Sequence, residues 1–368
     1  MADGDLRVLH ISARADVGGG PEHLYQLCRK LQDMGVESYI ACPQDFPYWQ
    51  RYQSLLGSSR LFQIPHRKFD VTRIFGLAKW IKAQGIRRIH SHGKGAGAYA
   101  LCLSFLVKLD WVHTPHGIHV GEYGWLKKKM YIFYERLAGF FIRCVIHVSE
   151  GEKTTGLSLR LWPVAKLTVI QNGTAKIESS RQEKPEIRAS LGFDVKSFIV
   201  LSVSRFDYAK NMSEALRIAE RLPHMLFVWL GDGPERTVLE AESRARKINN
   251  VIFVGNVADV RPYLQASDVY LSTSRWEGMS LAALEAMSAG IPLLLSDVVG
   301  NQDLVRTGVN GLLYPLGRID VACKQLDYWS HHLEEVRSLG ENSRKWHALH
   351  YSVDKMANAT KMVYLDES

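Results

Sequence analysis

Two glutamates, Glu277 and Glu285, stand in the mainly apolar stretch RWEGMSLAALEAMSAGIPLL, residues 275–294. The segment after Ser280 is rich in Leu, Ala and Met, which predicts a helix that is apolar nearly all round and buried. An ionised carboxylate in such a helix is unfavourable unless another group pairs with it or hydrogen-bonds to it. Glu285 is therefore either a solvated or locally paired residue, the commoner case, or an acceptor of hydrogen bonds from a polyhydroxylated ligand.

Two cations follow an apolar run in SFIVLSVSRFDYAKN, where Arg205 and Lys210 come just after a predicted strand. An Arg at the end of a strand with a Lys five residues later is suited to holding a diphosphate, because both side chains donate strong hydrogen bonds to phosphate oxygens. Two ordinary surface cations would give the same pattern.

A glycine-rich turn follows the first apolar run, where Gly18, Gly19 and Gly20 precede Pro21 and a helical pattern. Glycine lets backbone N–H groups approach a ligand closely, and the start of a helix favours phosphate. The same residues also suit an ordinary tight strand-to-helix turn, and they match neither a dinucleotide-binding motif nor a Walker loop. Both interpretations stay open at this point.

Five histidines lie in or beside two of the predicted strands: His90, His92, His113, His116 and His119. The spacing of the last three lacks the carboxylate or the helical i, i+4 pair of zinc motifs, so no metal site is predicted. Hydrogen-bonded histidines at strand ends account for most of them. His116, which precedes a glycine after a strand, is the one expected to face a ligand cleft.

The elements that position these residues are apolar, β-branched runs that alternate with helical stretches. The runs span 6–12, 38–43, 87–92, 110–117, 144–150 and 167–173, and then 197–205, 226–233, 251–256, 268–274 and 292–298. Such alternation predicts parallel sheets covered by helices on both faces, and the two series predict two doubly wound domains. The polar stretch 174–188 is the predicted linker. Ligands of such sheets bind beyond the carboxyl ends of the strands.

The composition fits an ordinary globular chain of 368 residues, 46% hydrophobic and 23% charged. The five cysteines are scattered and lack a CxxC pair, as is typical of reduced core residues. The N-terminus lacks the pattern of a signal peptide, and no apolar run approaches a membrane span, so a cytoplasmic protein is expected.

The net charge of +8 belongs wholly to the first half of the chain. Residues 1–175 contain 23 Lys and Arg against 13 Asp and Glu, which predicts contact with an anionic partner. No nucleic-acid-binding signature is present. The segment 123–143 joins Lys127, Lys128 and Lys129 to a run of aromatic and aliphatic residues, which favours a helix on an anionic membrane surface. The alternative is that its second part is core and the lysines are merely solvated.

Taken together, these stretches resemble the retaining glycosyltransferases of family 4, which have the GT-B fold. The resemblance rests on EGMSLAALEAMSAGIPLL with its E-x7-E spacing, on SRFDYAKN, LGDGPE, FVGNV and VNGLLYP in this order, and on GGGPE, TPHG and VIQNGT. It implies two Rossmann-like domains that face a central cleft. Residues 1–174 would bind the acceptor, 175–350 would bind the nucleotide sugar, and a C-terminal helix of about 351–368 would pack back on the first domain.

The resemblance also implies roles for single residues. Arg205 and Lys210 would hold the diphosphate of the donor, Glu285 the ribose hydroxyls, and Glu277 the hydroxyls of the transferred sugar. The remaining implied contacts are the backbone of Gly278, Met279, Ser280 and Leu281 to phosphate or sugar oxygens, His116 to the sugar, Gly18 and Gly19 near the diphosphate, and Asn256 and Val257 along the nucleobase.

The implied reaction moves a sugar, with retention and without a metal or cofactor, to a hydroxyl of a glycan acceptor. The expected donor is a UDP-sugar, with a GDP-sugar as the alternative, and the expected acceptor is a lipid-linked polysaccharide or lipopolysaccharide precursor at the inner face of the cell membrane. The chain departs from the commoner family pattern at 278–280 and at Asp303, which leaves the sugar open. Two other functions remain open: a sugar-nucleotide 2-epimerase of similar fold, and a non-catalytic nucleotide-sugar-binding module.

Overall fold

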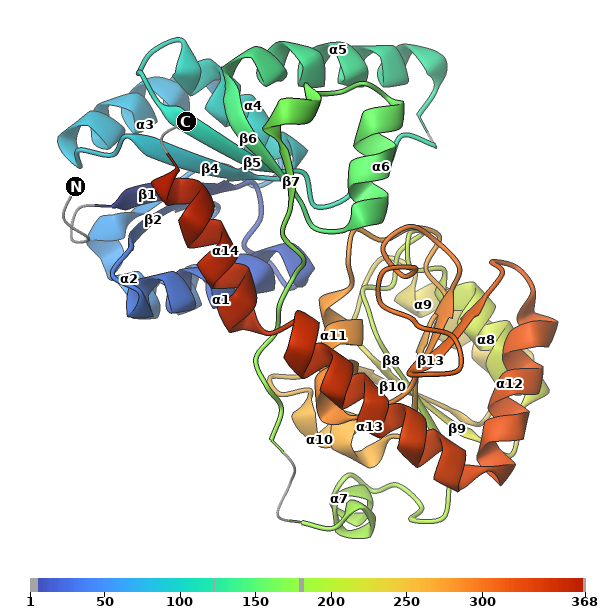
Figure 1. Cartoon of the computed structure of the whole chain (residues 1–368). Coiled ribbons are helices and arrows are strands. Elements are labelled where there is room, and N and C mark those ends of the chain that lie inside the picture. Colours follow the sequence, from blue (N-terminus) through green and yellow to red (C-terminus); the bar gives the residue numbers. More distant parts are fainter. Residues whose placement is uncertain (1–5, 122, 179–181, 367–368) are drawn as a thin grey trace. The chain divides into compact units, whose positions relative to one another are not determined.

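The computed structural model describes residues 6–121, 123–178 and 182–366, which form two compact units (Figure 1). The first unit comprises the chain up to Gly173 together with the segment that begins at Val353, and the second comprises Thr174–Ser352. These boundaries lie one residue and two residues from the predicted ones. Each unit is built on one parallel sheet, so the predicted pair of Rossmann-like domains is confirmed.

The sheet of the first unit has seven parallel strands in the order β3-β2-β1-β4-β5-β6-β7. Its strands are β1 (Arg7–Ser12), β2 (Glu37–Cys42), β3 (Leu61–Gln63), β4 (Arg88–His92), β5 (Asp110–Thr114), β6 (Ile142–His147) and β7 (Leu167–Val169). The central strands are buried almost throughout, as expected of a parallel sheet that helices cover on both faces.

Helices flank this sheet in two layers (Figure 1). One layer holds α1 (Gly19–Asp33), α2 (Tyr48–Leu56) and α14 (Val353–Leu365), and the other holds α3 (Val71–Ala83), α4 (Lys94–Ser104) and α5 (Trp125–Phe141), with α6 (Glu150–Ser158) after β6. Two starts show ordinary capping: the side chain of Asp70 accepts a hydrogen bond from the N–H of Thr72, and that of Ser149 from Glu152.

The last helix, α14, packs on α1 although more than 300 residues separate them in the chain. Val353, Met356, Ala357 and Tyr364 join the apolar cluster that α1 shares with the sheet. Lys30 forms an ion pair with Asp354 at 2.8 Å, and Lys361 donates to the carbonyl of Met34. The C-terminal helix is therefore part of the first unit.

The second unit has a six-stranded parallel sheet in the order β10-β9-β8-β11-β12-β13. Its strands are β8 (Ile199–Val203), β9 (Leu226–Leu230), β10 (Val251–Gly255), β11 (Val269–Ser272), β12 (Leu293–Ser296) and β13 (Gly311–Tyr314). Its helices are α7 (Lys184–Ser190), α8 (Met212–Arg221), α9 (Arg236–Ala245) and α12 (Ile319–His331), and α10 (Arg261–Ala266), α11 (Leu281–Ala289) and α13 (Leu333–His350).

The strand predictions missed two short elements, β3 and β13. The predicted linker 174–188 was too long, because its last part begins α7, whose Arg188 forms an ion pair with Asp268 of the second unit. Residues 179–181 of that linker, and the first five residues of the chain, lie outside the described ranges.

Candidate active site

The candidate site of the second unit lies at the topological switch point of its sheet, between β8 and β11, where the strand order reverses. From β8 the chain proceeds to β9 and β10 on one side, and β11 to β13 lie on the other side. The loops that follow β8 and β11 therefore diverge at the carboxyl ends of neighbouring strands, which is the ligand-binding position of doubly wound sheets. The first of these loops contains Arg205 and Lys210, and the second contains Glu277.

Lys210 and Glu277 form an ion pair across these two loops. The Nζ of Lys210 lies 2.6 Å from Oε1 of Glu277, which also accepts a hydrogen bond from the hydroxyl of Ser274 at 2.7 Å. The side chain of Glu277 is 10% exposed and that of Lys210 is 25% exposed. The pair is thus held in place yet reachable, and the Lys210 ammonium keeps two further N–H groups beyond this bond.

Arg205 forms an ion pair with Asp207, two residues further along the same loop. The Asp207 side chain also accepts the backbone N–H of Lys210 at 3.3 Å, so one carboxylate orders the loop that presents both cations. A guanidinium has five N–H donors, and 39% of the Arg205 side chain is exposed. Arg205 can therefore receive an anion without first breaking its ion pair.

Three residues that the sequence interpretation did not single out fix the end of this loop. Asn211 has a left-handed backbone (φ 53°), and its side-chain oxygen accepts a hydrogen bond from Arg275 at 2.8 Å. The hydroxyl of Thr273 bonds to the backbone carbonyls of Lys210 and Asn211, each at 3.0 Å. Lys210 is therefore tied to the β11 loop by backbone contacts as well as by Glu277. Only the Asn at a loop-to-helix junction gave a local signal of this arrangement.

The turn after β9 lies directly against the loop of Arg205. Gly231 has φ 118°, and a Cβ there would lie 1.9 Å from the carbonyl oxygen of Ser204. The backbone of Phe206 donates to Asp232 at 2.9 Å, which joins the two loops further. Glycine is required at position 231 by both the backbone angle and the close approach.

We expect Gly231→Ala to lower the free energy of unfolding by about 2 kcal/mol or more, because the substitution combines an unfavourable φ with a steric clash. Chemical denaturation measures the change. Gly20→Ala is the matched control, since nothing lies within 4 Å of a Cβ at that position. Equal stability of the two variants would contradict this account of the turn.

The helix after Glu277 begins as predicted. Ser280 is the N-cap residue of α11, and its hydroxyl accepts the N–H of Ala283 at 3.3 Å. The side chains of Met279, Ser280 and Leu281 are buried, so what they offer a ligand is their backbone. The start of the helix provides N–H groups that favour an anion.

Glu285 is half-buried on α11, between fully buried neighbours. Burial raises the pKa of the Tyr270 hydroxyl, and the negative charges of Glu277 and Glu285 raise it further, whereas a hydrogen bond with Ser280 lowers it. Both carboxylates therefore act on one buried phenol below the loops. Asn256, which is exposed, and Val257, which is half-buried, follow β10 at the same end of the sheet.

In the first unit, the corresponding reversal of the strand order, the topological switch point, lies between β1 and β4. Gly18 is the N-cap residue of α1 and Gly19 its first residue, so the glycine-rich turn does open a helix. His116 follows β5 with a left-handed backbone (φ 56°) and is half-buried. Its Nε2 lies 3.1 Å from Nδ1 of His92, and the next N–H, of Gly117, donates to the buried Glu152.

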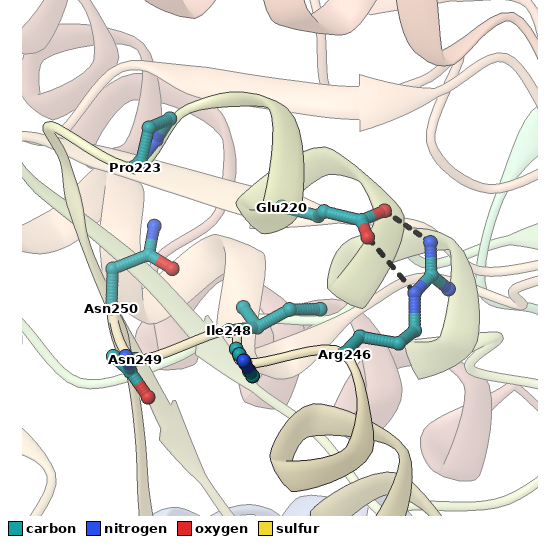
Figure 2. A pocket seen from close by; sticks show the side chains of 7 residues that line it. Glu220, Pro223, Arg246, Ile248, Asn249 and Asn250 are labelled. Atoms are coloured by element: carbon teal, nitrogen blue, oxygen red, sulfur yellow. Dashed lines mark hydrogen bonds and ion pairs between the residues drawn. The ribbon is translucent and has the colours of Figure 1, made fainter.

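A separate hollow of the second unit lies at the opposite end of its sheet (Figure 2). Glu220 and Arg246 form a bidentate ion pair at its wall, and Asn250 precedes β10 there. The Asn250 amide donates to the backbone carbonyls of Ala219, Leu222 and Met225, which secures the turn before β9. The charged pair and the Asn250 amide of this hollow are thus already engaged, and the hollow lies at the opposite end of the strands from the loops of Arg205 and Glu277.

Both parts of the chain match known glycosyltransferase families. Residues 17–175 match Glycosyltransferase Family 4, and residues 183–346 match Glycosyl transferases group 1. The fold and these two matches define a GT-B glycosyltransferase. The chain belongs to glycosyltransferase family 4, a family of retaining enzymes, as the sequence motifs had indicated.

Several characterised or named proteins are similar to the chain at low identity. The putative glycosyltransferase EpsD of Bacillus subtilis is 26% identical over 84% of this chain and 88% of its own length. An Escherichia coli protein named UDP-Gal:alpha-D-GlcNAc-diphosphoundecaprenol alpha-1,3-galactosyltransferase is 29% identical over 68% of each chain. The crystal structure of HepE from Anabaena in complex with UDP-glucose has a TM-score of 0.86 at 18% identity, covering 97% of this chain and 99% of that one.

Proposed function

We propose that this glycosyltransferase transfers a hexose from a UDP-sugar, with retention, to a hydroxyl of a lipid-linked glycan precursor. The observation that carries the proposal is the Lys210–Glu277 ion pair beside Arg205, at the topological switch point of the second unit. The two cations, Arg205 and Lys210, suit a diphosphate, and the nearby carboxylate of Glu277 suits the hydroxyls of a sugar. The carboxylate of Glu285, the fifth residue of α11, suits the hydroxyls of a ribose.

The reaction requires that negative charge develop on the departing diphosphate. Arg205, Lys210 and the N–H groups at the start of α11 stabilise this charge, each contact contributing a few kcal/mol when water is excluded. The acceptor hydroxyl attacks from the side of the leaving group, and the departing phosphate takes its proton, so the anomeric configuration is kept. Residues of this chain supply all of these contacts, and no step needs a metal.

The choice of a UDP-sugar rests on the named relatives. The E. coli relative is named for transfer of galactose from UDP-Gal to a diphosphoundecaprenol-linked sugar, and HepE was crystallised with UDP-glucose. Another relative, WbnH of E. coli, is named as an O-antigen biosynthesis glycosyltransferase and is 23% identical over 96% of this chain. These proteins favour a UDP-sugar donor and a lipid-linked acceptor for this chain.

The function is tested first by ligand binding. Thermal-shift titration with a panel of UDP- and GDP-sugars should give the largest stabilisation with one UDP-sugar, because the linkage of binding to folding raises Tm with affinity. The best donor is then offered with lipid-linked and with soluble glycan acceptors. Stabilisation by GDP-sugars alone would contradict the donor assignment, and transfer to soluble acceptors alone would contradict the lipid-linked one.

The outer face of α5 supports a membrane-bound acceptor. Leu126, Met130, Phe133, Leu137 and Phe140 are exposed on one side of this helix, at spacings of three and four residues. Its inner side, with Tyr131 and Ala138, is buried against the sheet. The second part of the segment 123–143 is therefore only partly core, whereas the alternative interpretation placed it in the core. A helix with this exposed apolar stripe and three lysines at its start suits the surface of an anionic membrane.

No helix within the described ranges is long and apolar enough to cross a membrane. A reversible surface contact is the proposal instead. Lys127 and Lys129 extend over the rings of Tyr123 and Trp125, at 4.3 and 4.8 Å from the ring centroids. Such cation–aromatic pairs place charge and apolar surface together at the start of the helix.

We expect the protein to co-sediment with anionic vesicles at low salt and much less with neutral vesicles. Changing Lys127, Lys128 and Lys129 together to Glu should abolish this binding, because each cation near an anionic surface contributes about 1 kcal/mol. Phe133→Ser with Phe140→Ser should weaken it at every salt concentration. A control for a charge change outside the segment replaces Lys324, an exposed lysine of the second unit, with Glu. The membrane contact would be refuted if co-sedimentation did not depend on lipid charge, on salt or on any of these substitutions.

A further inference from the structure

Five histidine side chains lie together at the topological switch point of the first unit, between β1 and β4. His10 lies on β1, His90 and His92 on β4, His23 on α1, and His116 after β5. The first four are at least nine-tenths buried, and His116 is half-buried. Burial lowers the pKa of all five members, that of His23 to about 4 although a hydrogen bond with Asn172 raises it. Repulsion from neighbouring histidines lowers the pKa of the other four further, and no carboxylate of the described residues is among the causes. These side chains are neutral imidazoles at neutral pH.

Hydrogen bonds occupy these histidines unequally. His90 uses both ring nitrogens, with Tyr364 at 2.5 Å and Thr114 at 2.7 Å. His92 bonds to His10 through Nε2 and to His116 through Nδ1, each at 3.1 Å. The Nδ1 of His23 has no hydrogen-bond partner although its residue is 95% buried, and its ring lies 4.6 Å from that of His116, edge to face.

We propose that His23, His92 and His116 bind a divalent transition-metal cation of the Zn²⁺ class through one ring nitrogen each. Ring nitrogens of these three residues lie within 4.8 Å of one another. Three imidazole ligands with an open fourth position form an established class of zinc site. The unpartnered buried nitrogen of His23 is the feature that an ordinary hydrogen-bonded cluster leaves unexplained.

The distances suit such an ion. Two nitrogens at about 2.0–2.1 Å from a tetrahedral Zn²⁺ are separated by about 3.3 Å. The Nδ1 of His92 and the Nε2 of His116 are 3.1 Å apart already. Binding requires that His116 carry its proton on Nδ1, so that both facing nitrogens offer a lone pair. Imidazole ligands select Zn²⁺, Co²⁺, Ni²⁺ or Cu²⁺ over Mg²⁺ and Ca²⁺, which prefer oxygen.

The surroundings provide an orienting partner and an access route. With the ion on Nδ1 of His92, its Nε2 carries the proton and donates it to Nδ1 of His10, 3.1 Å away, as ligands of known metal sites do to their outer partners. The partial exposure of His116 leaves one side for solvent, where a water completes the coordination. No step of the sugar transfer proposed above requires the ion, although one of its ligands, His116, is also the residue that the family resemblance places beside the sugar.

The experiment is a titration of untagged, metal-free protein with Co²⁺, followed by visible absorption. We expect one Co²⁺ per chain, an intense absorption typical of tetrahedral nitrogen coordination, and complete displacement by one equivalent of Zn²⁺. His116→Gln, at the half-buried position, should weaken Co²⁺ binding at least tenfold and lose the tetrahedral spectrum. His23→Gln should do the same, with circular dichroism and thermal unfolding as tests of its fold.

Two control variants separate this site from surface binding. His66→Gln removes an exposed histidine that lies beside the half-buried Asp16 and Asp45 in the same unit. His331→Gln with His332→Gln removes exposed histidines of the second unit. Both should retain the stoichiometry, spectrum and affinity of the unaltered protein. The proposal is overturned if Co²⁺ binds below one equivalent, if it shows only weak octahedral absorption, or if the control variants rather than His116→Gln remove it. Because no sugar donor or acceptor is added, failure here leaves the proposed function untouched.

Discussion

Lys210→Ala is expected to lower kcat by roughly 30- to 1,000-fold, which corresponds to the loss of about 2 to 4 kcal/mol of transition-state stabilisation. The proposed mechanism places the Nζ of Lys210 where charge develops on the departing diphosphate. Glu277 at 2.6 Å holds the side chain, and the Thr273 hydroxyl holds the backbone carbonyl of Lys210. Arg205→Ala should have an effect of similar size. The measurement is the rate of donor-dependent glycan formation at saturating donor.

The fold must survive these substitutions for the rates to be informative. Lys210 and Arg205 are partly exposed, at 25% and 39%, and both lie on loops rather than in the core. Thermal unfolding of both variants should therefore stay close to that of the unaltered protein. Lys324→Ala, which removes an exposed lysine of the same unit, should retain full activity. Near-normal rates in both Lys210→Ala and Arg205→Ala would refute the assignment of this pair to the leaving group.

Glu285→Ala and Glu277→Ala are expected to separate binding of the nucleotide from binding of the sugar. Loss of a charge-assisted hydrogen bond to ribose costs about 1.5 to 3 kcal/mol, so Glu285→Ala should weaken UDP binding by roughly 10- to 150-fold. Glu277→Ala should leave the affinity for free UDP unchanged or slightly higher, because it releases Lys210 from its ion pair. The same variant should lower kcat/KM for the intact donor by at least tenfold.

Calorimetry with UDP and with the intact UDP-sugar distinguishes these outcomes. Glu277→Gln is the control for shape, since it keeps the length of the side chain and can still accept a hydrogen bond from Ser274. It should be less damaging than Glu277→Ala. If the two alanine variants weaken UDP equally, the division of roles between Glu277 and Glu285 is wrong.

The sequence predicted the fold well because parallel strands and amphipathic helices leave strong local patterns. Eleven apolar runs were predicted as strands, and each contains or overlaps a strand of the structure. Each miss has a physical reason. β3 is three residues long, and β13 has the short apolar run GLLY after a Gly-rich turn, so neither gave a periodic signal. α7 lies in a polar segment whose helix is fixed by the ion pair of Arg188 with Asp268, a contact across 80 residues.

The candidate site was predicted in part for the same reason. Arg205 and Lys210 could be named because they follow a strand, and the carboxyl ends of parallel strands meet at one edge. Glu277 could be named because its E-x7-E stretch resembles that of the family. Their partners could not be named: Asp207, Ser274 and Thr273 act through distances that only the folded loops define. The roles of all these residues remain predictions until the variants are measured.

The histidine group shows the limit most clearly. The sequence argument weighed the local spacing of His113, His116 and His119 and predicted no metal site. In the structure His113 instead bonds to the hydroxyl of Ser91, while His116 meets His92 and His23 from other elements. These neighbours are brought together by the strand order, in which β1 lies beside β4. The spacing of residues along the sequence does not reveal this strand order.

The most direct test of the central claim is the anomeric configuration of the product. The protein is incubated with a UDP-hexose labelled with ¹³C at the anomeric carbon and with lipid-linked glycan acceptors, and the one-bond C1–H1 coupling of the product is measured by NMR. The account predicts an α-linked product from the α-linked donor, and UDP release that requires acceptor and falls with Lys210→Ala. A β-linked product, or a donor isomerised without any acceptor, would contradict it.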